Sequence, residues 1–249
     1  NVGEIENKGI ELSIGLQLVD TKDWNVRLNA SYNTNHNKVL SIGNAVPFAI
    51  GGFSSRTVQT VVAEGEPVGF IRGYKAVLNP DNSLKEILPL QNLGSTLPTA
   101  YGNFSLSASY KNLSFMLSGD YQYGAYVHSF DRQFRFSKGL KDDAIPEKAL
   151  EGLDQGANWL NFTNFFVEKS DFLKIRNIGI AYDYKPKKYL KSVNLAFNVY
   201  NPFAFTASSV DPEAALAGAR SQGAVAVGGL NYSSYSTPRQ YVGTIRVSF

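Results

Sequence analysis

The 249-residue chain has no cysteine, a single methionine and two histidines, and only 18% of its residues are charged. The lack of cysteine excludes a disulfide framework, a thiolate metal site and a cysteine nucleophile. No apolar run approaches the roughly 18 residues that a membrane-spanning helix needs, which excludes a helical membrane protein. The net charge of +3 comes without a concentrated basic patch, so nucleic acid is not an expected partner.

Aromatic residues and glycine are abundant instead, with 16 Phe, 14 Tyr and 22 Gly, and this composition favours a sheet protein. Apolar and polar residues alternate with a period of two, which is typical of strands with one apolar face. The alternation predicts an all-β chain of nine strands at residues 8–19, 24–40, 56–63, 68–78, 100–110, 113–124, 170–184, 192–204 and 240–249. A one-residue slip of the apolar phase at Arg176-Asn177 predicts a β-bulge.

The connections between these strands alternate in length. Short ones (20–23, 64–67, 111–112, 185–191) take turns with long ones (41–55, 79–99, 125–169, 205–239). Outer-membrane barrels show this pattern, with short periplasmic turns and long extracellular loops. The polar face is mostly Ser, Asn, Gln and Thr, and aromatics gather near strand ends as interfacial girdles require. We therefore predict an antiparallel transmembrane β-barrel, whereas a soluble β-sandwich enzyme or lectin would carry more charge on its outer face.

Strand parity bears on how much of a barrel the chain contains. Complete bacterial barrels have an even number of strands and both chain ends on the inside. Nine strands that begin on the outside do not meet this rule. We expect residues 1–249 to be the C-terminal part of a larger barrel.

Short motifs are distributed along nearly the whole chain. They are residues 1–12 (NVGEIENKGIEL), 64–69 (EGEPVG) with Gly73-Tyr74, 171–178 (DFLKIRNI) with Tyr182, 199–206 (VYNPFAFT), and Asp211-Pro212-Glu213 with 237–241 (TPRQY). In combination they resemble the SusC/RagA-type TonB-dependent transporters. The resemblance implies a barrel of about 22 strands whose plug domain and first strands are absent from this chain.

The resemblance also implies a function and partners. Such a protein would import a bulky nutrient, an oligosaccharide or a peptide, across the bacterial outer membrane without acting as an enzyme. It would work with a SusD-like lipoprotein and, through the missing N-terminal part, with the TonB complex. Outer-membrane lipid and the barrel assembly machinery would be further partners. A plug-less porin or a surface adhesin barrel is the alternative.

Aromatic and amide side chains are interleaved in the connection 125–169. Aromatic faces and amides are the groups that stack on and hydrogen-bond to carbohydrate. We therefore predict substrate binding for Trp159, Asn161, Phe162, Phe165 and Phe166. The alternative is that these aromatics pack against one another in a large loop or contact a lid protein.

The last strand carries apolar residues at alternate positions, Tyr241, Ile245, Val247 and the terminal Phe249, with Gly243 as the exception. This pattern resembles the C-terminal signal that the barrel assembly machinery reads. Phe249 would then lie in the periplasmic aromatic girdle.

Neither a metal site nor a catalytic site is predicted. His36 and His128 have no ligand-type residue at suitable spacing, and the stretch 78–85 lacks the spaced carboxylates of a calcium-like loop found in many members of the family. The acidic residues of the longest connection are interpreted as the solvated face of a short helix. The glycines from Gly218 to Gly229 lack the Gly-Lys-Ser/Thr of a phosphate loop. We expect no cofactor.

Overall fold

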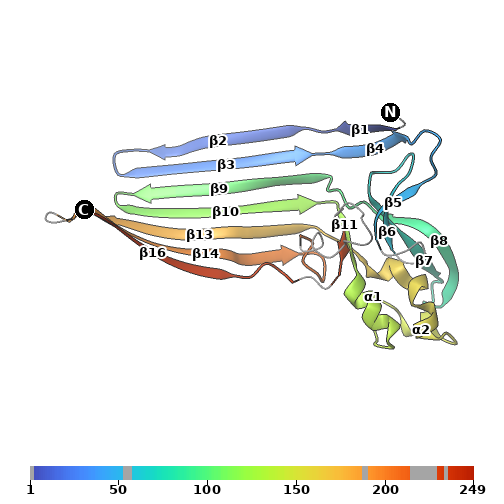
Figure 1. The fold of residues 1–249 in the computed structure, drawn as a ribbon. Helices are drawn as coiled ribbons and strands as arrows, with labels where there is room; N and C mark the ends of the chain where they lie inside the picture. Colours follow the sequence, from blue (N-terminus) through green and yellow to red (C-terminus); the bar gives the residue numbers. More distant parts are fainter. Residues whose placement is uncertain (1–2, 53–57, 187–189, 214–228, 233–234) are drawn as a thin grey trace.

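The computed structural model describes residues 3–52, 58–186, 190–213, 229–232 and 235–249. Its largest part is an antiparallel sheet of seven long strands in the order β16-β14-β13-β10-β9-β3-β2 (Figure 1). The strands are β2 (Glu11–Asp20), β3 (Trp24–Thr34), β9 (Ala100–Tyr110), β10 (Leu113–Tyr123), β13 (Phe172–Tyr184), β14 (Ser192–Thr206) and β16 (Gln240–Ser248). The nearly all-β, antiparallel fold class predicted from the alternation is confirmed.

The register of this sheet brings the apolar positions of all seven strands onto one face. One continuous row of paired residues runs through Leu16, Leu28, Leu106, Leu117, Ile178, Val199 and Tyr241. The next row lies on the opposite face and is polar or small, through Gly15, Asn29, Ser105, Ser118, Asn177, Tyr200 and Gln240. A slip of one residue in any strand would move its apolar set to the polar face, so the two faces fix the register.

Large apolar side chains on this face remain open along its length. Ile14, Leu16, Ile180 and Phe197 are each between 45% and 49% exposed. Near the short turns the face becomes aromatic, and the Trp24 and Tyr110 rings lie 4.5 Å apart between centroids. A continuous exposed apolar face with aromatics at its margin is the surface that a lipid bilayer covers.

A β-bulge interrupts β13 where the phase slip predicts it. The ladders of β13 with both neighbours skip Arg176: Ile175 pairs with Gly119 and Phe203, and Asn177 pairs with Ser118 and Tyr200. The prediction is confirmed. The extra residue allows Arg176 to reach Asp120 on β10 while Asn177 keeps its place on the polar face.

The strands expected at 56–63 and 68–78 form, but they are not part of the large sheet. They appear as β6 (Gln59–Val62) and β7 (Phe70–Leu78), in a separate sheet of order β5-β6-β7-β8 with β5 (Phe48–Gly52) and β8 (Leu84–Gly94). The expectation of nine barrel strands is therefore wrong, and the described residues contribute seven. The physical reason is burial, because successive residues of β6 and β7 such as Thr60, Val61 and Ile71 are completely covered. A strand in a barrel wall leaves alternate residues to lipid.

The predicted turn 64–67 also lies away from the short turns. Gly65 N–H donates to Val39 O, and Val39 N–H donates to Glu66 O, both in contact with β4 (His36–Ser41). β4 pairs with β1 (Glu4–Lys8) beyond the far end of the large sheet. Residues 35–99 thus form one long excursion between β3 and β9.

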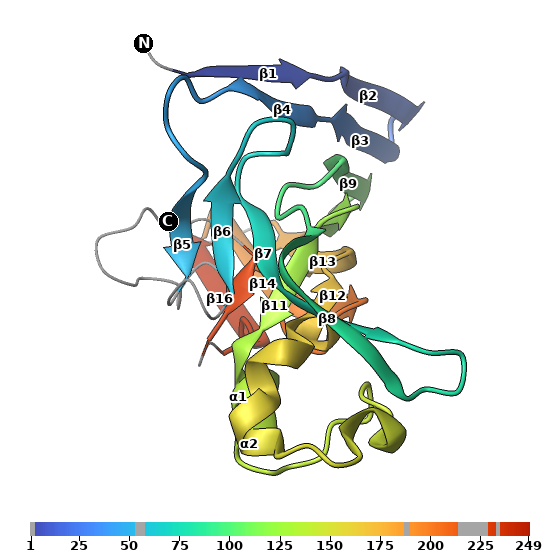
Figure 2. The ribbon, with the colours of Figure 1, turned by 90° about the vertical axis from the view of Figure 1, so that its right-hand side faces the viewer.

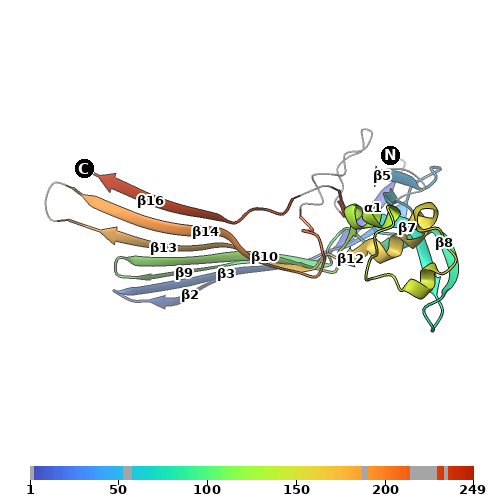
Figure 3. The ribbon, with the colours of Figure 1, turned by 90° about the horizontal axis from the view of Figure 1, so that it is seen from below.

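The described parts of the long connections gather at one end of the large sheet, opposite the tight turns (Figures 1 and 3). Residues 125–169 form β11 (Tyr126–Ser129), α1 (Phe130–Ser137), η1 (Glu147–Leu150), α2 (Gln155–Asn158), η2 (Trp159–Phe166) and β12 (Val167–Lys169), and β11 also pairs with β15 (Leu230–Asn231). We call β5–β8, β11, β12 and these helices the loop body (Figure 2). Within the described ranges, no helix combines the length and the hydropathy needed to cross a membrane.

Candidate functional site

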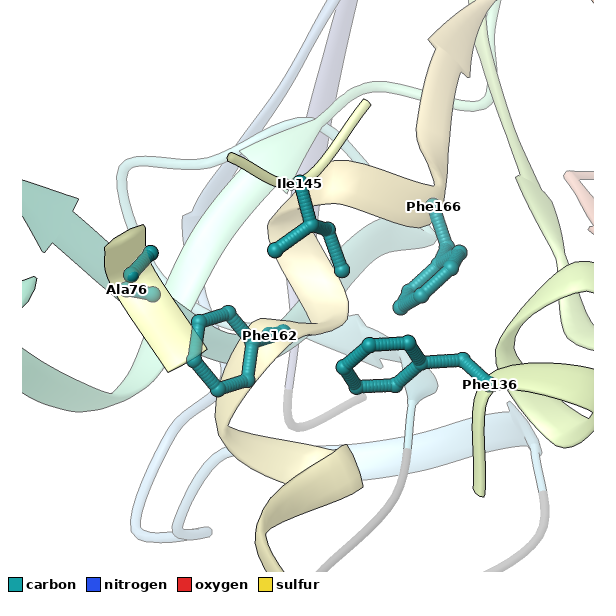
Figure 4. Packing of buried hydrophobic residues seen from close by; sticks show 6 residues of the cluster. Ala76, Phe136, Ile145, Phe162 and Phe166 are labelled. Carbon is teal, nitrogen blue, oxygen red and sulfur yellow. The ribbon is translucent and has the colours of Figure 1, made fainter. Parts of the chain in front are cut away.

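The predicted aromatic cluster lies in the loop body, where part of it forms a hydrophobic core. Phe162 and Phe166 are fully buried, and both pack against Phe136 of α1, with ring centroids 5.8 and 5.5 Å away. Ala76 of β7 and Ile145 also belong to this core (Figure 4). Ala149 of η1 is its sixth buried member. The rings of Phe162 and Phe166 therefore stabilise the loop body, as the self-packing alternative predicts.

The other predicted binding residues keep some exposed surface. Trp159 and Phe165 are half-buried at the margin of the core, and Asn161 donates from Nδ2 to Asn158 Oδ1 at 3.0 Å. The ring of Trp159 also contacts Phe130 edge-on, with centroids 6.1 Å apart. Of the five residues, these three offer a face to a ligand, and their role in substrate binding stays a prediction.

Asn164, one of the amides interleaved with the aromatics, joins the helical segment to the second sheet. Asn164 Oδ1 accepts from Ala76 N at 2.9 Å, and Asn164 Nδ2 donates to Ala76 O at 3.3 Å. One side chain thereby satisfies both backbone groups of a strand residue, as another strand would. The amide interleaved with the aromatics is structural at this position.

His128 is completely buried at the junction of β11 and α1. Its Nε2 lies 2.5 Å from Gln133 Oε1, and Gln133 Nε2 donates to Thr163 Oγ1 at 2.9 Å. Burial lowers the pKa of His128 to about 4, against an opposing contribution from the Gln133 hydrogen bond. The imidazole is therefore neutral at physiological pH and holds β11, α1 and η2 together.

The described residues contain no group of three or more His, Asp or Glu side chains that could hold a metal ion. Three carboxylates of the 125–169 connection, Asp142, Glu147 and Glu168, have cationic partners instead. Asp142 Oδ2 accepts from Arg132 Nε at 2.9 Å, and Glu147 pairs with Lys141. Asp142 is mostly buried beside Arg132. Glu147 is exposed, as the interpretation of a solvated helix face expects.

A second candidate site lies on the polar face of the large sheet, at its loop end. Lys174 Nζ is 2.5 Å from Asp211 Oδ1 and 2.5 Å from Glu213 Oε2. Arg176 Nη2 donates to Asp120 Oδ2 at 2.8 Å and to Glu213 Oε1 at 2.5 Å. We call these five residues the inner ion cluster. The Lys174 side chain is only 5% exposed, so these carboxylates take the place of water around its ammonium group.

A cavity of about 510 Å³ borders the inner ion cluster. Asp120 and Glu213 form one side of it, and Asn33 and Asn35 lie on the side of β3. These amide and carboxylate groups can hydrogen-bond to a polar solute, and Leu97, Pro98 and Phe172 add apolar surface to the same cavity.

The predicted assembly residues lie on the apolar side of the sheet at its last strand. Tyr241 is 63% exposed, Ile245 74% and Phe249 80%. β16 pairs with β14, and Val247 faces Val193 across that ladder. Recognition by the assembly machinery stays a prediction. The glycine run from Gly218 to Gly228 lies outside the described residues.

Comparison with known proteins bears on the identity of this sheet. No protein-family model matches the chain. Over its whole length it is 25% identical to TonB-dependent receptor P26 and 24% identical to TonB-dependent receptor P3, both of Formosa agariphila. Its fold matches the RagAB peptide importer in the closed-closed state over the whole chain, with a TM-score of 0.73 at 21% identity. The resemblance to the SusC/RagA-type TonB-dependent transporters is confirmed.

The chain spans about 30% of the length of these TonB-dependent receptors, and about 30% of the matched RagAB chain. Two of the motifs that carry the resemblance meet in space. Lys174 and Arg176 belong to the motif 171–178, and Asp211 and Glu213 belong to the Asp-Pro-Glu motif. Sequence analysis detected both motifs but could not detect their contact, because alternation along a strand carries no information about a segment that folds back over it.

Proposed function

We propose that the intact protein imports a bulky nutrient across the bacterial outer membrane, energised by the TonB complex. The observation that carries this proposal is the seven-stranded sheet with one apolar and one polar face, in a chain that resembles TonB-dependent receptors along its whole length. The apolar face contacts outer-membrane lipid, and the polar face lines the passage. The barrel assembly machinery inserts the protein, with Phe249 as part of its signal.

The nutrient is proposed to be a peptide or an oligosaccharide, and a SusD-like lipoprotein is proposed to cover the loop end. The solved structures that the fold resembles are described as a peptide transporter and a peptide importer, which supports the peptide class. The half-buried Trp159 and Phe165 keep some apolar surface open, which supports a ligand with apolar faces, as either class has. Both residues lie in the loop body, where a nutrient from outside would first arrive.

The test uses the full-length protein in its native host. Deleting the gene should abolish growth on the peptide or glycan mixture that the protein serves, and the intact gene should restore it. Inactivating TonB in the restored strain should abolish growth again. A plug-less porin would continue to admit solute without TonB, and a surface adhesin would leave uptake unchanged after deletion. Either result would contradict the proposal.

A further inference from the structure

Residues 207–213 follow β14 and turn from the strand end toward the polar face of the sheet. Ala207 N–H donates to Asp171 O at 2.9 Å, and Ser208 Oγ donates to Val210 O at 2.6 Å. Glu213 N–H donates to Asp211 Oδ1 at 3.1 Å. The first bond anchors the start of the segment to Asp171, and the other two, each between residues two apart, give the segment a defined shape. We call residues 207–213 the strap.

The inner end of the strap is attached to the sheet by charge rather than by apolar packing. Asp211 and Glu213 both contact Lys174, and Glu213 also contacts Arg176. Burial raises the pKa of Asp211, but the hydrogen bond and the charge of Lys174 outweigh it, so the net shift is downward. The strap carboxylates are therefore ionised at physiological pH. They balance the positive charges of Lys174 and Arg176 on β13.

The outer end of the strap is attached to the loop body. Ser209 N–H donates to Glu168 Oε2 at 2.5 Å, and Ser209 Oγ donates to Glu168 Oε1 at 2.9 Å. Glu168 of β12 also pairs with Arg132 of α1. A displacement of β12 or α1 therefore pulls directly on the strap.

The strap reaches across the polar face rather than along its edge. Glu213 comes from a segment that follows β14, yet it lines the 510 Å³ cavity together with Asn33 of β3 and Asp120 of β10. In the sheet order, β13, β10 and β9 lie between β14 and β3. Glu213 at the end of the strap thus reaches over the middle strands of the polar face, at their loop end.

We propose that the strap narrows the loop end of the passage and leaves Lys174 and Arg176 when a nutrient passes. This inference rests on the proposed function, because it takes the polar face as the lining of the passage. Ion pairs suit a segment that binds reversibly. When the strap leaves, water or a polar solute can take the place of its carboxylates at Lys174 and Arg176. The bonds from Ser209 to Glu168 make movement of the loop body the cause of release.

The first test measures access to the face behind the strap, in the full-length protein on whole cells. A single cysteine at Asn33 is labelled with a membrane-impermeant maleimide. Replacing both strap carboxylates, Asp211→Asn with Glu213→Gln, should accelerate labelling at least tenfold. A cysteine at Asn82, on the exposed turn between β7 and β8, should react at the same rate in both backgrounds. An unchanged rate at Asn33, with normal amounts of protein in the membrane, overturns the proposal.

The second test covers the case in which the neutralised strap does not insert. A charge swap, Lys174→Asp with Asp211→Lys and Glu213→Gln, keeps opposite charges in contact without setting Glu213 against the new carboxylate, and labelling at Asn33 should stay as slow as with the unchanged strap. Cysteines placed at Lys174 and Asp211 can also be bridged by a short bis-maleimide. Bridging should reduce nutrient uptake more than tenfold relative to the same variant before bridging. Undiminished uptake after complete bridging overturns release of the strap. The labelling assay does not depend on uptake, so failure of the proposed transport function would be visible separately.

Discussion

Leu28 lies midway along β3, between Trp24 and Tyr32, which both lie on the apolar face near the ends of the strand. At about 3.4 Å per residue and a strand tilt of about 40°, each of these aromatics lies about 10 Å from Leu28 along the membrane normal. Leu28 therefore occupies the centre of the apolar band. Its paired neighbours, Leu16 and Leu106, are apolar as well.

Arginine at this position has no partner and no route to water. Leu28→Arg should lower the free energy of unfolding by about 2–4 kcal/mol, which is a change of roughly 30- to 1,000-fold in the folding equilibrium. The assay is denaturant unfolding of the full-length protein in lipid vesicles. Asn29→Arg is the matched control, because Asn29 lies on the polar face beside Ser105 and the chain already carries Arg27 on that face. Equal stability of the two variants would refute the assignment of the faces.

Three further predictions concern other parts of the molecule. Phe162→Ala removes a fully buried ring and should destabilise the loop body by about 3–5 kcal/mol. Hydrogen exchange in η2 should become faster while the heat stability of the barrel stays unchanged. An unchanged exchange rate would contradict the buried core. The pKa of His128 lies below its ordinary value, so as the pH falls the unfolded loop body binds a proton before the folded one does. The free energy of unfolding of the loop body should therefore decrease by up to about 3 kcal/mol between about pH 6.5 and pH 4. Limited proteolysis across this pH range measures that loss, and it should be absent in His128→Asn. Deleting Phe249 should lower the amount of full-length protein in the outer membrane severalfold while leaving uptake per inserted molecule unchanged, and normal abundance would argue against the assembly signal.

The strands of the large sheet could be predicted from sequence because each has one face toward lipid and the other toward water. Leu28 and Asn29 point to opposite faces, and this contrast is visible locally as alternation. The same rule explains why β6 and β7 were assigned to the wrong sheet. Thr60, Val61 and Ile71 are covered on all sides, so their alternation is mixed, and the mixed pattern was the only local sign that they lie elsewhere.

The candidate sites were harder to predict because they depend on contacts between distant segments. Whether Phe162 is a ligand platform or a core residue is decided by Phe136 and Ala76, which come from other elements. β8 was missed because Leu90 has a positive φ and the ladder with β7 shifts register several times, so its alternation is broken. The pairing of Lys174 with Asp211 likewise depends on a segment that folds back onto the sheet.

The central claim, that the seven-stranded sheet is a lipid-facing barrel wall and the second sheet is not, can be tested by one spin-label scan of the full-length protein in vesicles. Nitroxides placed in turn along Leu113–Tyr123 of β10 and Phe70–Leu78 of β7 report access to dissolved oxygen in lipid and to a water-soluble nickel complex. We predict that oxygen access along β10 peaks at Leu113, Phe115 and Leu117 and that nickel access peaks between them. No position of β7 should show lipid access. A period-two oxygen signal in β7, or its absence from β10, would contradict the account.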